Sequence, residues 1–209
     1  MFGYVRGGYA RVLERFAEVL DGSGVDLANN ARVARVDRTP SSVRVEMAEG
    51  GDLYFDRVVV TVPPPAAVGM LPGLDPEDRG RLAAVRYQGI VCASVLLAKP
   101  LADFYVTNIT DPAPFTAVVE MTALVDPAEL GGRHLVYLPK YVPPDDPIFA
   151  EPDQAVRERF LTAVAGMYPH FSRDDVLAFR VSRVRHVFPV PTLNYSATVP
   201  PVVTSVPGV

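Results

Sequence analysis

Three consecutive prolines, Pro63 to Pro65, follow one of the longest apolar runs of the sequence, RVVVTV at 57–62. Proline lacks a backbone N–H group, so it continues neither a β-ladder nor a helix interior. The run therefore predicts a strand buried on both faces, and the segment PPPAAVGMLPGLDP at 63–76 predicts a domain boundary. The same prolines, and the shortness of GIVCASVLLA at 89–98, exclude a membrane-spanning helix from these two runs.

The composition favours a globular protein with a substantial core, since 49% of the 209 residues are hydrophobic and 21% are charged. A net charge of -4, without a basic patch, argues against binding of nucleic acid or an anionic membrane surface. The single cysteine, Cys92, excludes a disulfide framework and a cysteine-based metal site. Because the N-terminus also lacks the pattern of a signal peptide, we expect a cytoplasmic location.

Helical periodicity is clear near the N-terminus, where the spacing of apolar residues from Tyr9 to Leu20 predicts one apolar helix face. Gly22 and Gly24 end this helix. A short strand at 25–27 is predicted next, and a three-stranded meander follows it, formed by ARVARV, SVRVEM and DLYF. Alternation of apolar and charged residues places one face of the meander on a core and the other in water.

The second half of the chain predicts two helices and several strands. Asp75 followed by Pro76 is typical of a helix start, and the helix extends to about Val85. A second helix is predicted at 153–167, with four apolar residues on one face, namely Val156, Phe160, Val164 and Met167. Strands are predicted at QGIVCASVLLA, FTAVVEM, RHLVYLP and LAFRVSRVRHVF, and an extended, irregular path at 189–209. The chain is therefore predicted to be an α+β protein.

Familiar catalytic motifs are absent from the sequence, which has no G-x-G-x-x-G, Walker, H-E-x-x-H or G-x-S-x-G pattern. The histidines His134, His170 and His186 are far apart, so we expect hydrogen-bonded or surface histidines and no metal site. The pairs Asp145–Asp146 and Asp174–Asp175 are better explained by a polar turn and a helix N-terminus. The glycines Gly7 and Gly8 leave two interpretations open, a close approach by a cofactor or strand and a flexible lead-in.

The stretches GYVRGGYARVLERFAEVL at 3–20 and GVDLANNARVARVDRTPSSVRVEMAEGGDLYFDRVVVTVPPPAA at 24–67 resemble the middle of a flavin-containing amine oxidase, protoporphyrinogen oxidase or phytoene desaturase type oxidoreductase. The resemblance is specific over 4–66 and looser but continuous over 75–209. It implies FAD as cofactor and hydride removal from a substrate carbon. It also implies that Gly7 and Gly8 lie near the flavin, that the backbone of Val33 meets the adenine, and that Val62 and Pro63 lie close to the dinucleotide.

The resemblance also implies a domain organisation. Residues 1–70 would form a partial FAD-binding domain consisting of a helix, a strand, a three-stranded meander and a buried strand. Residues 71–190 would form a substrate domain with a mixed sheet and flanking helices, and 191–209 would return to the FAD-binding domain. Four tyrosines are our candidates for the substrate pocket, namely Tyr87, Tyr137, Tyr141 and Tyr195.

Two departures from the family pattern shape these expectations. The sequence has neither the N-terminal dinucleotide motif nor the C-terminal glycine-rich segment of the family, so we expect a central fragment that is inactive and does not hold FAD tightly by itself. Cys92 stands approximately where many amine oxidases have a lysine. This favours dehydrogenation or desaturation of a small, largely apolar molecule over oxidation of an amine.

Two other classes of protein remain open at this point. A flavin-dependent sugar-nucleotide mutase of similar layout would direct arginines at a pyrophosphate, and Arg180, Arg183 and Arg185 are the candidates. The same arginines also suit one face of a solvated strand. Alternatively, the chain is a non-catalytic binding module that retains the fold of the substrate domain. The sequence does not indicate an oligomeric state.

Overall fold

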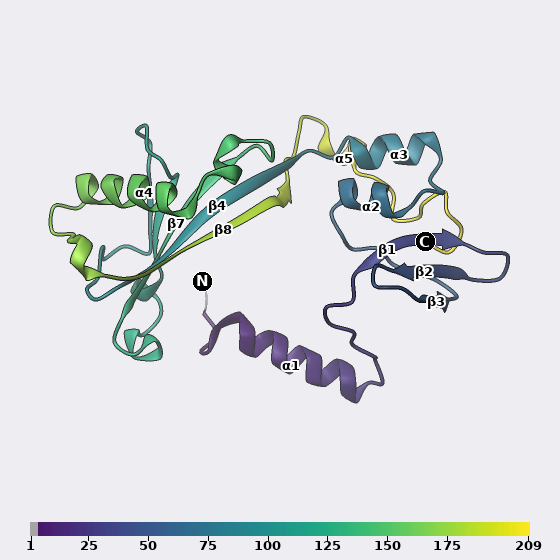
Figure 1. The fold of residues 1–209 in the computed structure, drawn as a ribbon, viewed down its shortest axis with the longest axis horizontal. Helices are drawn as coiled ribbons and strands as arrows, with labels where there is room; N and C mark the ends of the chain where they lie inside the picture. Colours follow the sequence, from purple (N-terminus) through teal and green to yellow (C-terminus); the bar gives the residue numbers. More distant parts are fainter. Residues whose placement is uncertain (1–3) are drawn as a thin grey trace. The chain divides into compact units, whose positions relative to one another are not determined.

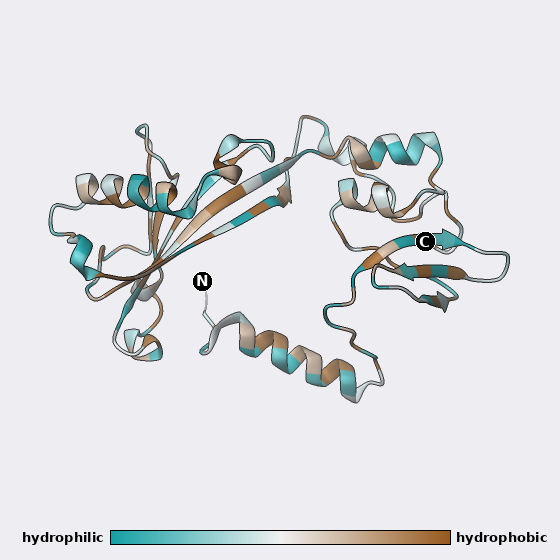
Figure 2. Ribbon diagram, in the orientation of Figure 1, coloured by the Kyte–Doolittle hydropathy of each residue, from teal (hydrophilic) through white to brown (hydrophobic). Residues whose placement is uncertain are grey.

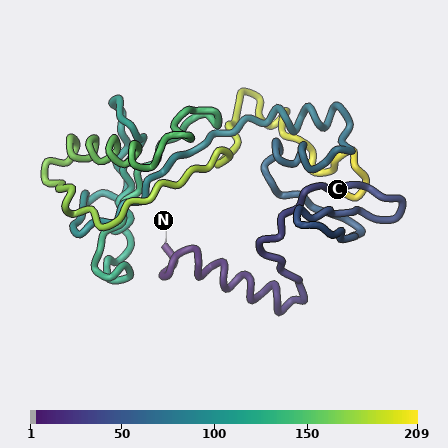
Figure 3. Tube along the Cα trace, viewed as in Figure 1, coloured from purple at the N-terminus to yellow at the C-terminus, as the bar shows by residue number. Residues whose placement is uncertain are grey.

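The computed structural model describes residues 4–209 and divides the chain into two compact units (Figure 1). The large unit comprises residues up to Ser23 and Tyr87–Phe188, and the small unit comprises Gly24–Arg86 and Pro189–Val209. The chain therefore passes between the units three times, as the tube in Figure 3 allows the reader to follow. Within residues 4–209, no helix combines the length and apolar composition that crossing a bilayer requires.

The large unit is built on a five-stranded sheet with the order β5-β6-β7-β4-β8, in which the pairings β5–β6, β6–β7 and β7–β4 are antiparallel. Its strands are β4 (Tyr87–Leu97), β5 (Val106–Asn108), β6 (Ala117–Glu120), β7 (His134–Val142) and β8 (Val176–Pro189). Its helices are α1 (Gly8–Gly22), α4 (Asp153–Met167) and the short 3-10 turns η1 (Met121–Ala123), η2 (Pro127–Leu130), η3 (Pro147–Ala150) and η4 (Arg173–Asp175).

Helix α4 and one face of this sheet form the core of the large unit. From Gly89 to Leu97, strand β4 alternates between buried and half-buried residues, and much of it is hydrophobic in Figure 2. The buried residues pack with the apolar face of α4, where the rings of Phe160 and Phe115 meet edge to face at 5.3 Å. The predicted bounds of α4 are confirmed, and Val156, Phe160 and Val164 are buried as predicted, whereas Met167 is exposed.

The small unit contains the three-stranded antiparallel sheet β1-β2-β3, whose strands are β1 (Val33–Arg38), β2 (Val43–Met47) and β3 (Asp52–Phe55). Its helices are α2 (Pro64–Met70), α3 (Pro76–Ala83) and the single turn α5 (Tyr195–Thr198). The predicted meander is confirmed. The predicted start of α3 is confirmed as well, since Asp75 caps the helix by accepting a hydrogen bond from the Asp78 amide. Together the two units confirm the α+β class.

Two local predictions in the small unit are wrong. The run 57–62 is not a strand, because no strand of the described chain pairs with it; the Val58 amide donates to the Gly208 carbonyl at 2.8 Å, and Val59 is 84% exposed. The three prolines after this run form the start of a helix. Pro63 is the N-cap of α2, and the next two prolines occupy its first turn. This position tolerates proline because the first helical N–H groups have no intrahelical partner. Residues 25–27 also have no strand structure.

Helix α1 forms as predicted, but it buries none of its residues. In Figure 2 hydrophobic and hydrophilic residues alternate along it, which agrees with the predicted amphipathic pattern. Its apolar face, including Leu13 and Phe16, is exposed in this structure.

Candidate functional site

The face of the large sheet that points away from α4 is the candidate functional site. On β4 this face carries Ile90, Cys92 and Ser94, which alternate with the core residues between them. The register of β7 places Tyr141 opposite Ile90 and Tyr137 opposite Ser94. We call this surface the open face and define it by these five residues together with Phe188, whose ring lies 6.0 Å from that of Tyr141.

The open face is uncharged. Burial raises the pKa of the Cys92 thiol to about 11, so the group is a neutral thiol at neutral pH. The pKa of Tyr137 is also raised, mainly by burial and further by the neighbouring Cys92 and Tyr4. None of the six residues of the open face carries a formal charge at neutral pH. A face of this kind suits an apolar or aromatic group, and Cys92 does not have the environment of a reactive thiolate.

The structure brings together two of the four candidate tyrosines, Tyr137 and Tyr141. Tyr87 lies at the start of β4, where its ring meets that of His186 edge to face at 5.2 Å. Tyr195 belongs to the small unit and lines a cavity of about 160 Å³ with residues that include Arg86 and Val190. Tyr137 and Tyr141 share a face because side chains alternate along a strand, so residues four apart on β7 point to the same side.

Gly7, the N-cap of α1, and Gly8, its first residue, both have positive φ angles, 86° and 70° respectively. Glycine adopts this left-handed region without the steric cost that other residues have there. The Gly7 amide donates a hydrogen bond of 3.1 Å to the Glu129 carboxylate, and a Cβ on Gly8 would lie 3.1 Å from the Tyr4 hydroxyl. The structure therefore shows a defined turn at Gly7 and Gly8 instead of a flexible lead-in.

Val33 lies at the start of β1, an edge strand of the small sheet, opposite Met47. The Ala48 amide donates to the Arg32 carbonyl at 2.8 Å, which makes Val33 and Met47 a pair without mutual hydrogen bonds. The Met47 amide instead donates to the Gly51 carbonyl at 3.0 Å, on the side away from β1. By the same ladder geometry, the N–H and C=O groups of Val33 both point away from β2, towards the outer edge of the sheet.

The other two cofactor candidates, Val62 and Pro63, lie in the small unit immediately before α2. Val62 is exposed, and the Pro63 carbonyl accepts hydrogen bonds from the Ala66 and Ala67 amides. The backbone at this point is therefore fixed by the first turn of the helix, while the Val62 side chain remains accessible.

Two of the arginines considered for a pyrophosphate already have partners on the α4 side of the large unit. Arg183 lies 2.5 Å from the Asp153 carboxylate and donates to the Glu151 carbonyl at 2.6 Å. Arg185 lies over the Phe149 ring at 4.5 Å and donates to the Pro144 carbonyl. Arg180 is exposed on β8, and no hydrogen bond or ion pair of the described structure links it to Arg183 or Arg185.

The three histidines do not form a site together. His134 contacts the Thr122 hydroxyl, His170 donates to the Leu101 carbonyl at 3.0 Å, and His186 meets Tyr87. In the part of the chain that the structure describes, no group of histidine, cysteine and acidic residues has an arrangement that could hold a metal ion. Sequence reasoning missed Glu120, whose only signal is a single acid within the apolar run FTAVVEM.

Comparisons with known proteins give one family match and several structures of similar fold. The model of the family "Flavin containing amine oxidoreductase" matches residues 1–206. Similar solved structures include a candidate protoporphyrinogen oxidase from Exiguobacterium, at 16% identity and a TM-score of 0.77, over 93% of this chain and 42% of that one. A reduced UDP-galactopyranose mutase is similar at 13% identity and a TM-score of 0.73, over 92% of this chain and 42% of that one.

A double mutant of putrescine oxidase is also similar, at 18% identity and a TM-score of 0.66, over 88% of this chain and 41% of that one. At these identities the structural comparisons establish the fold, and no curated protein matches the sequence. The chain spans less than half the length of these structures. Since the family model matches nearly the whole sequence, this chain belongs to the flavin-containing amine oxidoreductase family.

Proposed function

We propose that this chain forms part of an FAD-dependent oxidoreductase that removes a hydride from a carbon atom of its substrate. The match of the family model to residues 1–206 carries this proposal. In it, the small unit and the turn at Gly7 and Gly8 contribute to cofactor binding, and the five-stranded sheet of the large unit contributes to substrate binding. A cytoplasmic location is part of the same proposal, because the single thiol, Cys92, has no disulfide partner in the chain.

The backbone of Val33 supports the cofactor part of the proposal. Its outward N–H and C=O groups form a donor and an acceptor side by side, which is the pattern that an adenine edge recognises. Val62 and Pro63 would lie against the dinucleotide, and the turn at Gly7 and Gly8 would approach the flavin. When bound, FAD supplies the redox chemistry by accepting the hydride, and the protein orients the substrate and excludes water.

The open face supports the substrate part of the proposal. Its neutral character suits a small, largely apolar molecule, and Tyr137 and Tyr141 would contact it. Tyr87 and Tyr195 are proposed as further pocket residues. With neutral Cys92 approximately where many amine oxidases have a lysine, we favour dehydrogenation or desaturation over amine oxidation.

A sugar-nucleotide mutase has weaker support, although one structure of similar fold is such an enzyme. A mutase site needs arginines free to bind a pyrophosphate, and Arg183 and Arg185 already have partners on the α4 side. A non-catalytic binding module stays as the remaining alternative, since the open face could hold an apolar ligand without FAD.

The complete gene product that contains this chain provides the test. The purified protein should show the visible absorbance of an oxidised flavin, release FAD on denaturation, and lose its visible absorbance anaerobically when an oxidisable substrate is added. A colourless protein that does not take up added FAD would contradict the proposal. Conversion of UDP-sugars without net oxidation would support the mutase, and bound FAD without any substrate-dependent bleaching would leave only a binding role.

A further inference from the structure

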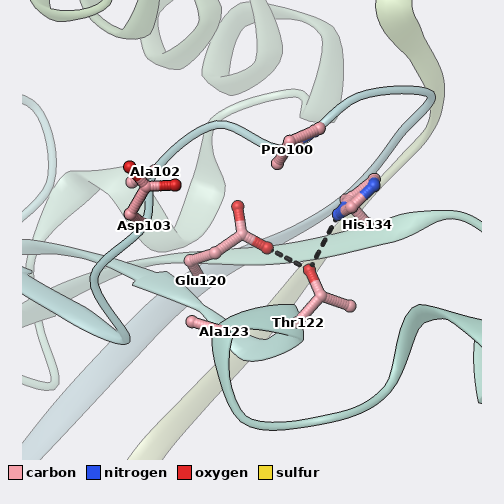
Figure 4. Close-up of a pocket in the computed structure, with 7 residues that line it drawn as sticks. All are labelled: Pro100, Ala102, Asp103, Glu120, Thr122, Ala123 and His134. Atoms are coloured by element: carbon pink, nitrogen blue, oxygen red, sulfur yellow. Dashed lines mark hydrogen bonds between the residues drawn. The ribbon is translucent and has the colours of Figure 1, made fainter.

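The connection between β6 and β7, residues 121–133, is held at its base by side chains at the ends of the two strands (Figure 4). The Thr122 hydroxyl donates to the carboxylate of Glu120, the last residue of β6, and lies 3.3 Å from Nδ1 of His134, the first residue of β7. Glu120 is buried and also accepts a hydrogen bond of 3.1 Å from the Leu101 amide. This network joins the two ends of the connection, which therefore leaves the sheet from a fixed base.

The single 3-10 turn η2 carries Glu129 on this connection and is closed at both ends. Asp126 caps its start by accepting a hydrogen bond of 2.9 Å from the Ala128 amide. Gly131 ends it in the left-handed region, with a φ angle of 65°. The Glu129 side chain is only 25% exposed, so a carboxylate that belongs to a fixed turn is largely covered by its neighbours.

The Glu129 carboxylate holds the segment that precedes α1. One of its oxygens accepts a hydrogen bond of 3.1 Å from the Gly7 amide, and the other lies 3.6 Å from Nε of Arg6. The Gly8 amide donates to the Val5 carbonyl at 2.7 Å, and Gly7 has a φ of 86° and a ψ of 0°. These are the angles that glycine takes at the third position of a type II turn. Because α1 buries none of its residues, the placement of this segment depends on the turn.

The turn places Tyr4 beside Tyr137 of the open face. The Tyr4 hydroxyl lies 3.1 Å from the position of a Cβ atom on Gly8, so the side chain folds back over the turn. The pKa of Tyr137 is raised by burial and further by Cys92 and Tyr4, because negative charges on neighbouring groups repel each other. Tyr4 is 43% exposed, so more than half of its surface is covered at this place.

We propose that Tyr4 is a specificity-determining residue that forms a wall of the substrate site on the open face, and that Glu129 is the residue that positions it. The inference rests on the proposed function, in which this face contacts the substrate. A tyrosine ring presents a large, rigid surface that is mostly apolar, which suits the uncharged open face. The wall therefore limits the size of the group that can lie beside Tyr137.

Benzyl alcohol and naphthalenemethanol are the probes, a smaller and a larger uncharged aromatic molecule. Calorimetric titration of the complete gene product measures the dissociation constant of each probe. Tyr4→Ala should shift the ratio of the two constants about fivefold or more in favour of the larger probe, because it removes the wall. Glu129→Ala should shift the ratio in the same direction, because it releases the Gly7 amide. Glu129→Gln should behave like the wild type, because its amide oxygen can still accept from Gly7.

Hydrogen exchange tests the positioning step directly. The Gly7 amide should exchange about fivefold faster in Glu129→Ala than in the wild type or Glu129→Gln. Glu14→Ala, which removes an exposed acid of α1, is the control and should change neither the exchange nor the ratio.

A purely structural role of these residues would weaken binding of both probes equally and leave the ratio unchanged. That result, or a wild type that binds neither probe, would overturn the proposal. The FAD content of the same preparations separates this outcome from failure of the proposed function. A protein without FAD whose probe ratio still shifts would contradict the redox function and support the wall.

Discussion

Gly89 on β4 lies directly under the ring of Phe149. A Cβ atom built on Gly89 would lie 2.7 Å from Cζ of Phe149 and 3.1 Å from the carbonyl oxygens of Val184 and Arg185. Arg185 in turn covers the same ring at 4.5 Å. The neighbouring strand and the ring therefore approach so closely that only glycine fits at this position.

Gly89→Ala should destabilise the large unit by roughly 1–3 kcal/mol, because the added methyl group must displace a buried ring or the backbone of β8. Urea unfolding followed by circular dichroism measures the change. Gly166→Ala in α4 is the matched control: nothing lies within 4 Å of its Cβ position, and alanine should stabilise the helix by roughly 0.5–1 kcal/mol. Equal effects of the two substitutions would contradict the close packing at Gly89.

Asp37 should make the small unit sensitive to acid. Hydrogen bonds from Arg35, at 2.5 Å, and from Arg44, at 3.0 Å, lower the pKa of Asp37 below its usual value of 3.8. As the pH falls, the Asp37 carboxylate of the unfolded chain therefore takes up a proton before that of the folded chain does. The stabilisation that ionised Asp37 gives the folded state is present above about pH 4 and is lost as the pH falls through the lowered pKa.

The difference in free energy of unfolding between the wild type and Asp37→Asn should therefore shrink between about pH 6 and about pH 3. Asp56→Asn is the control, because this exposed acid follows β3 and forms no ion pair of its own in the described structure. A pH-independent difference for Asp37→Asn would show that the two arginines do not stabilise the ionised carboxylate.

Cys92 should resist alkylation in the folded protein. Burial raises the pKa of this thiol from 9.0 to about 11, and only the thiolate reacts. Iodoacetamide should modify the native protein much more slowly than the denatured protein at about pH 8, and the difference should shrink towards about pH 11. Rapid modification of the native protein at the lower pH would contradict a half-buried, neutral thiol.

The same shift predicts a loss of stability in alkali. The unfolded state releases the thiol proton before the folded state does, so the stabilisation is complete below pH 9.0 and is lost as the pH rises through about 11. Cys92→Ala should lack this part of the pH dependence. Tyrosines and lysines titrate in the same range, and the comparison of the two proteins removes their contribution.

Val33→Pro tests the backbone contact proposed for FAD. Proline removes the outward N–H group, and no hydrogen bond between β1 and β2 is lost, because that group does not point towards β2. In the complete gene product, FAD affinity should fall about tenfold while thermal stability changes little. Val33→Ala keeps the N–H group and should bind FAD normally. Equal affinity of the proline variant would exclude this contact.

The elements that depend on local interactions follow from the sequence alone. The cap at Asp75 and the apolar spacing of α4 predict both helices, because capping and helical periodicity involve residues only three or four positions apart. Alternation along β4 and β7 likewise determines which residues share a face. Tyr137 and Tyr141 could therefore be placed together from the sequence.

Tertiary structure decided everything that depends on a distant partner. Residues 57–62 have the composition of a buried strand, yet a strand needs a neighbouring strand along its backbone. The described structure gives this run no paired strand and joins its Val58 amide to the Gly208 carbonyl of the C-terminal segment. The outward direction of the Val33 backbone depends on its register against Met47. The burial of Glu120 depends on the Leu101 amide, which the fold brings to the Glu120 carboxylate from a separate part of the chain. Periodicity describes one segment at a time, whereas pairing, burial of charge and hydrogen-bond direction are properties of several segments in contact.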